Sequence, residues 1–359
     1  CLIVMDNCKE LGDKIDQNIM QRRSKKDSFI IPTNLVRFNN GEGKAVIEDS
    51  VRDKDLYIIS DIGNHSMTYK MYGYINHMGP DEHFMDIKRV ISAVRGQADR
   101  VTVVMPLLYE SRQHRRKGRE SLDCALALQE LQNLGVSTIV TFDVHDPNIQ
   151  NAVPTSMSFE NFYPTNTILK EFIKNEEFDP ETVKFISPDT GAMDRAKYYA
   201  NMFQADVGMF HKRRDYSKIV DGKNPIVAHN YLGGNLEGET AIVVDDMIAS
   251  GTSMLEVAVD LKKRGARKVF LISTFSMFTN GLECFNKAFE EGLFEKLYST
   301  NLTYVDKDAL TKPWYEQIDC SNYASDIINT LNTSGSISEL KNGKQKILTM
   351  LQKKKNGEL

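Results

Sequence analysis

Two adjacent carboxylates and a run of small residues lie close together in the second half of the chain. Asp245 and Asp246 follow the apolar run 241–244. The small residues that come next are Ala249, Ser250, Gly251, Thr252 and Ser253. Such residues let backbone N–H groups close around a phosphate, and a helix that starts there adds the positive end of its dipole. Carboxylates suit ribose hydroxyls, directly or through Mg²⁺. The segment predicts a phosphorylated ribose, because a simple helix cap at Ser253 would leave the paired acids unexplained.

A dense cationic segment lies in the first half of the chain. Its basic residues are Arg112, Arg115, Arg116, Lys117 and Arg119. Such a loop suits a triphosphate, because arginine binds two oxygens at once. The alternatives are a solvated charge run and a nucleic-acid patch, but no aromatic residues alternate with the basic ones. The net charge of −4 gives no overall attraction to nucleic acid or to an acidic membrane. We therefore expect no nucleic-acid partner and no membrane partner.

The elements that must position these residues alternate along the chain. The expected strands are 56–60, 101–105, 138–142, 183–186, 207–210, 241–244 and 268–272. The expected helices are 81–98, 121–134, 193–202 and 253–264. The strands are continuously apolar at their centres, as expected when both faces are covered. Alternation of this kind predicts an α/β fold with parallel sheets and crossover helices.

The length and composition of the chain predict its organisation. A chain of 359 residues suggests two domains, and the two halves repeat one strand–helix plan. We predict domains at 1–155 and 156–330, with a helical tail at 331–359. The apolar stretch 1–5 is too short for a signal peptide, and no run of about 18 apolar residues could cross a membrane. Five cysteines without a C-x-x-C pair suggest reduced thiols and a cytoplasmic protein.

Several segments carry a resemblance to known proteins. The stretch 243–253 resembles the binding loop of the phosphoribosyltransferase superfamily, and four other segments resemble ribose-phosphate diphosphokinase within it. The four are Arg37–Glu42 (family pattern R-F-x-(D/N)-G-E), Met105–Ser121 (P-Y-x-x-Y-x-R-Q-D-R-K…R-E), Thr141–Gln150 (D-L-H-x-x-Q-I-Q), and Ile186–Ala192 with Phe210–Arg214 (S-P-D-x-G and D/H-K-x-R). The resemblance covers roughly residues 37–305, in the order of the family.

This resemblance implies a fold, a reaction and partners. The fold would be two tandem phosphoribosyltransferase-like domains, each a mostly parallel sheet flanked by helices. The reaction would transfer the β,γ-diphosphoryl group of ATP to the anomeric hydroxyl of ribose 5-phosphate, with Mg²⁺ as cofactor. The products would be phosphoribosyl diphosphate and AMP. The chain would form a homo-oligomer built from dimers.

The resemblance also assigns roles to single residues. Phe38 would stack on adenine while Asn40 and Glu42 bond its edge across a subunit boundary; without the resemblance this segment reads as a surface turn. Further ATP-binding residues would be Arg112, Gln113 and His145, and the metal would be held by His145 and Asp189. The catalytic pair would be Lys212 and Arg214, which strict strand alternation places on one face. Ribose 5-phosphate would bind Asp245, Asp246, Ala249, Ser250, Gly251, Thr252 and Ser253.

Two departures from the family pattern keep other readings open. His114 stands where the family has Asp, and Ala249 replaces an acid in a phosphate loop one residue shorter than usual. We therefore expect a divergent branch of the bacterial type. One alternative is a phosphoribosyltransferase that consumes phosphoribosyl diphosphate, which would have no use for Arg112, Gln113 or His145. Another is a non-catalytic regulatory subunit that resembles the synthetase.

Overall fold

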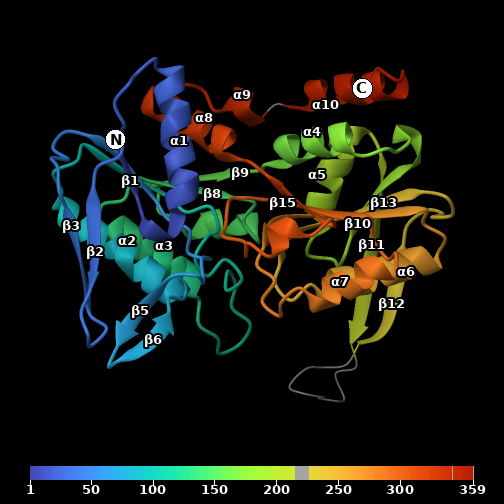
Figure 1. Ribbon diagram of the computed structural model, residues 1–359, viewed down its shortest axis with the longest axis horizontal. Coiled ribbons are helices and arrows are strands. Elements are labelled where there is room, and N and C mark those ends of the chain that lie inside the picture. The colour runs from blue at the N-terminus through green and yellow to red at the C-terminus, as the bar shows by residue number, and fades with distance from the viewer. Residues whose placement is uncertain (215–225, 342, 359) are drawn as a thin grey trace. The chain divides into compact units, whose positions relative to one another are not determined.

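The computed structural model describes residues 1–214, 226–341 and 343–358, and all of their side chains except 212–214, 226–229 and 341. The chain forms two compact units, each assembled from separate stretches of sequence (Figure 1). The first unit contains residues 1–164, 301–305 and 319–341. The second unit contains residues 165–300, 306–318 and 342–359.

The first unit is built on a five-stranded parallel sheet in the order β1-β4-β7-β8-β9. Its strands are β1 (Leu2–Val4), β4 (Asp55–Ile59), β7 (Arg100–Val104), β8 (Thr138–Phe142) and β9 (Ser158–Phe162). Its helices are α1 (Lys9–Arg22), α2 (Pro80–Val94), α3 (Asp123–Asn133), α8 (Ser321–Asn332) and α9 (Ser338–Lys341). Two antiparallel hairpins extend from it, β2 (Thr33–Arg37) with β3 (Gly43–Ile47), and β5 (Thr68–Met71) with β6 (Tyr74–His77).

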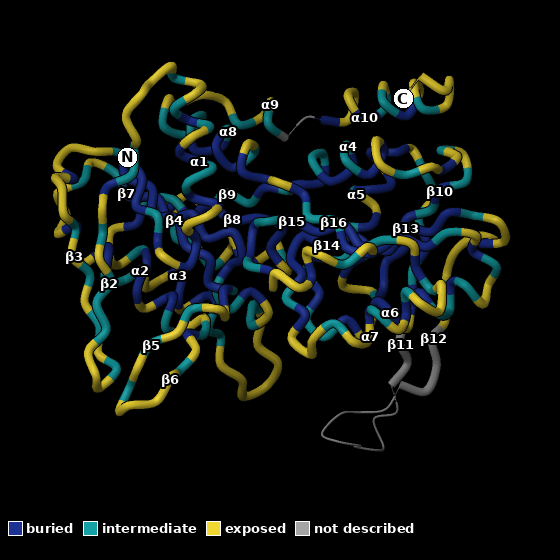
Figure 2. The backbone as a smooth tube through the Cα atoms, viewed as in Figure 1, coloured by how far each residue is buried: buried dark blue, intermediate teal, exposed yellow. Residues whose placement is uncertain are grey.

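The second unit contains a seven-stranded sheet in the order β12-β11-β10-β13-β14-β15-β16, parallel except for the β11–β12 pair. Its strands are β10 (Val183–Ser187), β11 (Asp206–Arg214), β12 (Ile226–Leu232), β13 (Thr240–Ile248), β14 (Lys268–Ser276), β15 (Lys296–Thr300) and β16 (Tyr315–Ile318). Its helices are α4 (Thr165–Asn175), α5 (Met193–Phe203), α6 (Thr252–Lys263), α7 (Glu283–Glu290) and α10 (Lys344–Lys355). The central strands are dark blue in Figure 2 because their apolar residues are buried on both faces.

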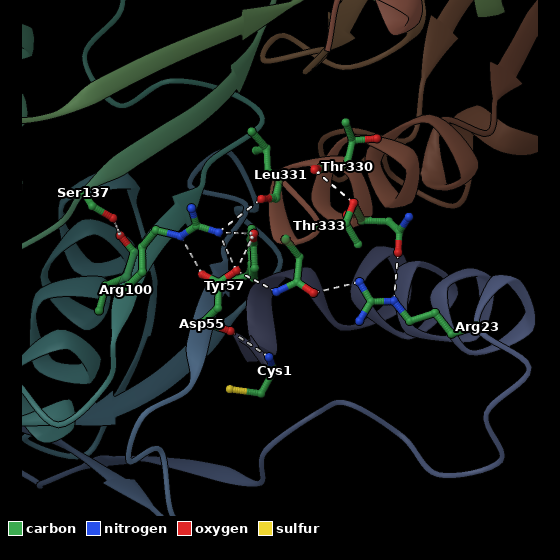
Figure 3. A network of polar contacts seen from close by, with 12 residues as sticks. Cys1, Arg23, Asp55, Tyr57, Arg100, Ser137, Thr330, Leu331 and Thr333 are labelled. Atoms are coloured by element: carbon green, nitrogen blue, oxygen red, sulfur yellow. Dashed lines mark hydrogen bonds and ion pairs between the residues drawn. The ribbon is translucent and has the colours of Figure 1, made fainter. Parts of the chain in front are cut away.

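Helix α8 joins the first unit although it comes late in the sequence. Arg100 bonds both carboxylate oxygens of Asp55, at 2.8 and 2.6 Å, and it also donates to the carbonyl oxygen of Leu331 at 3.1 Å (Figure 3). Asn332 completes the cluster with a 2.6 Å bond to Asp55. Burial raises the pKa of Asp55, but the bonds from Arg100 and Asn332 outweigh it and hold that pKa below its usual value. These bonds fix the end of α8 against the sheet.

The predicted α/β architecture with helix-flanked parallel sheets is confirmed, and all seven expected strands form. Strand β13 is longer than predicted, because Asp245 pairs with Ser273 and Ile248 pairs with Ser276 on β14. The acidic pair therefore lies within the strand rather than after it. Among the described residues, no helix combines the length and the apolar character needed to cross a membrane.

The compact units differ from the predicted domain boundaries in two places. Strand β9 pairs in parallel with β8, which assigns the chain as far as Pro164 to the first unit. Helix α8 also belongs to that unit, whereas α10 belongs to the second. The predicted tail is helical over most of its length, and two of its side chains, Ile347 and Leu351, are buried.

Candidate functional site

The predicted phosphate loop contains the short turn between β13 and α6. Gly251 has a φ of +81° and precedes the first helical residue, Thr252, and no side chain caps the helix. A Cβ atom on Gly251 would lie 2.1 Å from Cζ of the buried Phe285, so both backbone conformation and space require glycine. The uncapped first turn directs its amide groups out of the helix, as an anion site requires. Ser253 is the second helical residue, so the interpretation of Ser253 as a simple helix cap is wrong.

Backbone hydrogen bonds from the segment that follows β14 fix the shape of this loop. The amide of Met277 donates to the carbonyl oxygen of Ile248 at 2.8 Å, and the amide of Thr279 donates to that of Ala249 at 2.9 Å. The hydroxyls of Ser250 and Thr252 lie 3.2 Å apart. The structure therefore brings hydroxyl and amide donors of residues 249–253 together at one end of the sheet.

The two acids on β13 share an arginine. Nη1 of Arg195, a nearly buried residue of α5, lies 3.7 Å from Oδ1 of Asp245 and 3.8 Å from Oδ1 of Asp246. The amide of Asp246 donates to Oδ1 of Asp245 at 2.9 Å. Burial, followed by the charge of Asp246, raises the pKa of Asp245 well above its usual value, while Arg195 opposes the shift. The arginine thus stabilises two adjacent carboxylates that would otherwise repel each other.

Asp189 lies in the turn after β10, next to β13 in the sheet. Its Oδ1 accepts bonds from the amides of Gly191 at 2.8 Å and Ala192 at 3.2 Å, and its charge contributes to the raised pKa of Asp245. Among the described residues, no three acidic, histidine or cysteine side chains converge as a complete metal site. Mg²⁺ is commonly held by one or two carboxylates together with substrate phosphates, and the carboxylates of Asp189, Asp245 and Asp246 suit that chemistry.

Lys212 and Arg214 lie on β11, whose backbone pairs antiparallel with β12. Lys212 lies opposite His229 and Arg214 opposite Ile226, with a shift of register between Arg213 and Arg214. This shift interrupts the strict alternation from which a common face was expected. The side chains of both residues are outside the described part of the chain, so their predicted role stays a prediction.

In the first unit, the predicted adenine-binding segment is the turn of the β2–β3 hairpin. Phe38 is 46% exposed, and the ammonium group of Lys44 lies 5.9 Å from its ring centroid. Asn40 donates to Glu42 through its side-chain amide at 2.9 Å and accepts from the Glu42 backbone at 3.2 Å. Gly41 takes the left-handed conformation with a φ of +92°. The turn is therefore preformed and presents an exposed aromatic ring beside a cation.

The predicted ATP-binding segment, Met105–Ser121, lies in the connection 105–122 between β7 and α3. Arg112 is exposed. Gln113 donates to the carbonyl oxygen of Ser121 at 2.8 Å, which closes the loop on itself. The ring of Tyr109 stacks on Phe84 with centroids 4.2 Å apart, which anchors one end of the loop on α2. The loop thus holds its basic residues outward on a closed base.

His145 follows β8 and is exposed. Its ring lies 5.5 Å from the ring of His114 in the cationic loop, and Nε2 of His114 lies 3.1 Å from Oδ2 of Asp146. The structure therefore brings the cationic loop and the end of β8 together in the first unit. His145 and Asp189, both predicted to hold metal, lie in different units.

Two participants were not predicted from the sequence. Arg195 is one, and its signal would have been a basic residue in the first turn of a helix that directly follows an acidic strand end. The partnership of His114 with Asp146 is the other. His114 was visible only as a departure from the family pattern, and nothing in the spacing indicated an acid 32 residues later (146 − 114).

A parallel sheet with two acids in the last part of one strand, followed by a turn that requires glycine and by an uncapped helix, defines the class: this is a phosphoribosyltransferase-type fold. Residues 165–278 match the family model described as the phosphoribosyl transferase domain. Residues 1–135 match the N-terminal domain of ribose phosphate pyrophosphokinase.

Similar whole proteins agree with both matches. Ribose-phosphate pyrophosphokinase A of Dictyostelium discoideum is 26% identical over 306 residues, covering 85% of this chain and 88% of that protein. Ribose-phosphate pyrophosphokinase 2 of Schizosaccharomyces pombe is 28% identical over 309 residues, with coverages of 85% and 88%. The crystal structure of phosphoribosylpyrophosphate synthetase from Mycobacterium smegmatis has the same fold, with a TM-score of 0.76 at 20% identity over 93% of this chain and 99% of that one. The chain belongs to the ribose-phosphate pyrophosphokinase family of enzymes.

Proposed function

We propose that this enzyme transfers the β,γ-diphosphoryl group of ATP to the anomeric hydroxyl of ribose 5-phosphate. The observation that carries the proposal is the loop at Gly251, where a sterically required glycine leaves an uncapped helix start beside two carboxylates. Membership of the ribose-phosphate pyrophosphokinase family favours a reaction that makes phosphoribosyl diphosphate over one that consumes it.

In the proposed reaction, the anomeric oxygen attacks the β-phosphorus. The bond between that phosphorus and the oxygen bridging to the α-phosphorus breaks, and AMP leaves with the bridging oxygen. The proton of the anomeric hydroxyl passes to solvent. Negative charge builds up among the phosphate oxygens, so electrostatic positioning is the main task of the protein.

The second unit carries the residues proposed for ribose 5-phosphate. The amides and hydroxyls of residues 249–253 hold the 5-phosphate, in the way that helix starts bind anions. Asp245 and Asp246 accept bonds from the ribose hydroxyls, and Arg195 keeps the two carboxylates together. Lys212 and Arg214 stabilise the diphosphoryl group as it transfers, a role that rests on the family pattern alone.

The first unit carries the residues proposed for ATP. Phe38 stacks on adenine, and Asn40 and Glu42 bond its edge. Arg112, Gln113 and His145 contact the phosphates. Since Gln113 already donates to Ser121, it also acts by keeping the cationic loop closed.

Mg²⁺ is the proposed cofactor, with His145 as a proposed protein ligand in the first unit and Asp189 as a proposed protein ligand in the second. When bound, it neutralises charge on the phosphate oxygens. The carboxylate oxygens near Asp189 match its ligand preference. We further propose a cytoplasmic enzyme, in keeping with five free thiols, and a homo-oligomer built from dimers in which the adenine site is shared.

The test is an assay of the purified chain alone with ATP, ribose 5-phosphate and Mg²⁺. The proposal expects AMP and phosphoribosyl diphosphate in equal amounts. If the chain forms no AMP but releases diphosphate from phosphoribosyl diphosphate when a nucleobase is added, it is a phosphoribosyltransferase. A chain inactive in both assays, but active when a catalytic relative is added, is a regulatory subunit.

The roles of Lys212 and Arg214 need a separate measurement. The double variant Lys212→Ala/Arg214→Ala should lose turnover by about a hundredfold or more, with little change in ATP affinity, as expected for contacts made in the transition state. Unchanged turnover would remove both residues from the mechanism.

A further inference from the structure

One imidazole links the cationic loop to the end of β8. Nδ1 of His114 lies 3.2 Å from the carbonyl oxygen of Ser111, and Nε2 lies 3.1 Å from Oδ2 of Asp146. Both partners are oxygen acceptors, so each ring nitrogen has an acceptor within hydrogen-bonding distance. The side chain of His114 is only 10% exposed. The imidazole is therefore a fixed cross-link rather than a mobile surface group.

The positions that this cross-link joins are adjacent to the proposed ATP contacts. Ser111 directly precedes Arg112, and Asp146 directly follows His145. Asp146 is itself held, because its Oδ1 accepts the amide of Asn148 at 2.9 Å. The ring of His114 also lies 5.5 Å from that of His145. Fixing the ring of His114 thus fixes the backbone on both sides of the contact between loop and strand end.

The charges favour the same conclusion. Without a hydrogen-bond partner, the carboxylate of Asp146 would face the region where polyphosphate is proposed to bind, and like charges would repel. The contact with Nε2 of His114 holds Oδ2 of that carboxylate in place. Arg112 is left to contact phosphate, since its exposed guanidinium is not the partner of Asp146 in this arrangement.

We propose that His114 and Asp146 form a positioning pair, which holds the Arg112–Gln113 segment beside His145 so that these residues act together on the phosphates of ATP. The proposal rests on the proposed function, because it assigns this region of the first unit to ATP. His114 is a positioning residue, since it acts through Arg112 and His145 rather than on the substrate. If the pair served only to stabilise the fold, its loss would change KM for ATP and KM for ribose 5-phosphate equally.

Two substitutions separate the two bonds of the ring. In His114→Gln the amide nitrogen can still reach Asp146 but not Ser111, whereas in His114→Asn it can reach Ser111 but not Asp146. We expect His114→Asn to raise KM for ATP and to lower kcat, each by about fivefold to tenfold, and His114→Gln to stay within about threefold of the wild type. KM for ribose 5-phosphate should not change in either variant.

Asp146→Asn tests the other half of the pair. This variant keeps an oxygen for the amide of Asn148 but loses the charge that faces His114. We expect it to match His114→Asn, and the double variant to be no worse than either single one, because both remove the same interaction. The control is His77→Gln on β6, where the histidine also bonds a carbonyl oxygen but lies outside the proposed site.

Two measurements test the proposed pair separately from the proposed reaction. Equilibrium binding of Mg-ATP to the intact chain is measured alongside turnover, and melting temperatures should agree within about 2 °C. Weaker ATP binding in His114→Asn and Asp146→Asn, with binding restored in His114→Gln, supports the pair. ATP binding unchanged in all three variants, or KM for ribose 5-phosphate raised as much as KM for ATP, overturns it. A wild-type chain that binds ATP but forms no AMP contradicts the proposed reaction and leaves the binding test intact.

Discussion

Two connections in the molecule run from a parallel strand to a helix and bear anion-binding chemistry, but they are built in opposite ways. The β13–α6 connection is residues 249–251, whereas the β7–α3 connection is residues 105–122. The short one offers amide and hydroxyl donors on a fixed backbone. The long one offers guanidinium and ammonium groups on a loop closed at its base.

The difference follows from the anions proposed for each connection. A single phosphate has constant size, so a rigid turn at a helix start can surround it with neutral donors. A triphosphate is longer and more highly charged, and it is better met by several long cationic side chains. The short connection therefore depends on backbone geometry, and the long one depends on side-chain charge.

Replacing a glycine in each connection should give the largest contrast. Gly251→Ala places a Cβ atom 2.1 Å from Phe285 at a φ of +81°, so the turn must open. We expect kcat/KM for ribose 5-phosphate to fall by about a hundredfold or more. The matched control is Gly118→Ala in the cationic loop, where φ is +75° and no atom lies within 4 Å of the new Cβ.

The control should cost only the conformational penalty of a left-handed residue, about 1–2 kcal/mol of local stability, with near-normal kinetics. Steady-state kinetics of both variants against both substrates make the measurement. If kcat/KM fell equally in the two variants, backbone geometry would matter as much in the long connection as in the short one.

Removing a charge from the long connection should have the next largest effect. Arg112→Ala loses hydrogen bonds to a charged group, each of which is worth about 1.5–3 kcal/mol. We expect kcat/KM for ATP to fall by roughly tenfold to a hundredfold, with KM for ribose 5-phosphate unchanged. Arg112→Lys should recover part of the loss, because lysine keeps the positive charge but cannot bind two oxygens at once as a guanidinium group does. An effect of Arg112→Ala on ribose 5-phosphate alone would reverse our assignment.

Acidification should affect the two connections differently. Burial and Asp246 raise the pKa of Asp245, so this carboxyl takes up a proton at a higher pH than an ordinary aspartate. Its ability to accept ribose hydroxyl bonds is then lost as pH falls through the raised pKa. An arginine side chain stays charged throughout, so the affinity for ATP should not weaken in the same way as the pH falls.

We expect kcat/KM for ribose 5-phosphate to fall as the pH is lowered from the neutral range, because Asp245 takes up a proton as the pH falls through its raised pKa. The substrate phosphate itself titrates near pH 6, so the comparison is with Asp245→Asn at each pH. The two pH profiles should differ only for ribose 5-phosphate. Identical profiles would mean that Asp245 does not lose its charge in this range.

Removing one neutral donor should have the smallest effect. Ser250→Ala deletes a hydroxyl that lies 3.2 Å from Thr252, and one neutral hydrogen bond is worth about 0.5–1.5 kcal/mol. KM for ribose 5-phosphate should rise by about twofold to tenfold, with KM for ATP unchanged. A loss as large as that of Gly251→Ala would mean that side chains, not the backbone, bind the phosphate.

The sequence predicted the short connection better than the long one. Alternating apolar runs indicated both sheets, and the small residues at 249–253 indicated the donor-rich turn at the start of α6, because its donors are local in sequence. The partners of Arg195 and His114 were missed, since they depend on which strand ends are neighbours in space. The hairpin strands β5 and β6 were missed too, because their mostly exposed residues lack the continuous apolar pattern of a buried strand. The end of β13 was misplaced, because pairing with β14 outweighed the unfavourable strand propensity of aspartate.

The late arrival of α8 in the first unit has a consequence for synthesis on the ribosome. The first long stretch of that unit ends at residue 164, but Leu331 comes 331 − 164 = 167 residues later. At about 5–20 residues per second, the ribosome needs roughly 10–35 s to make that interval. Throughout it, Arg100 and Asp55 have no Leu331 or Asn332 to bond. The nascent first unit therefore stays incomplete while the entire second sheet is translated, and a chain that stops before α8 would lack the bonds that complete it.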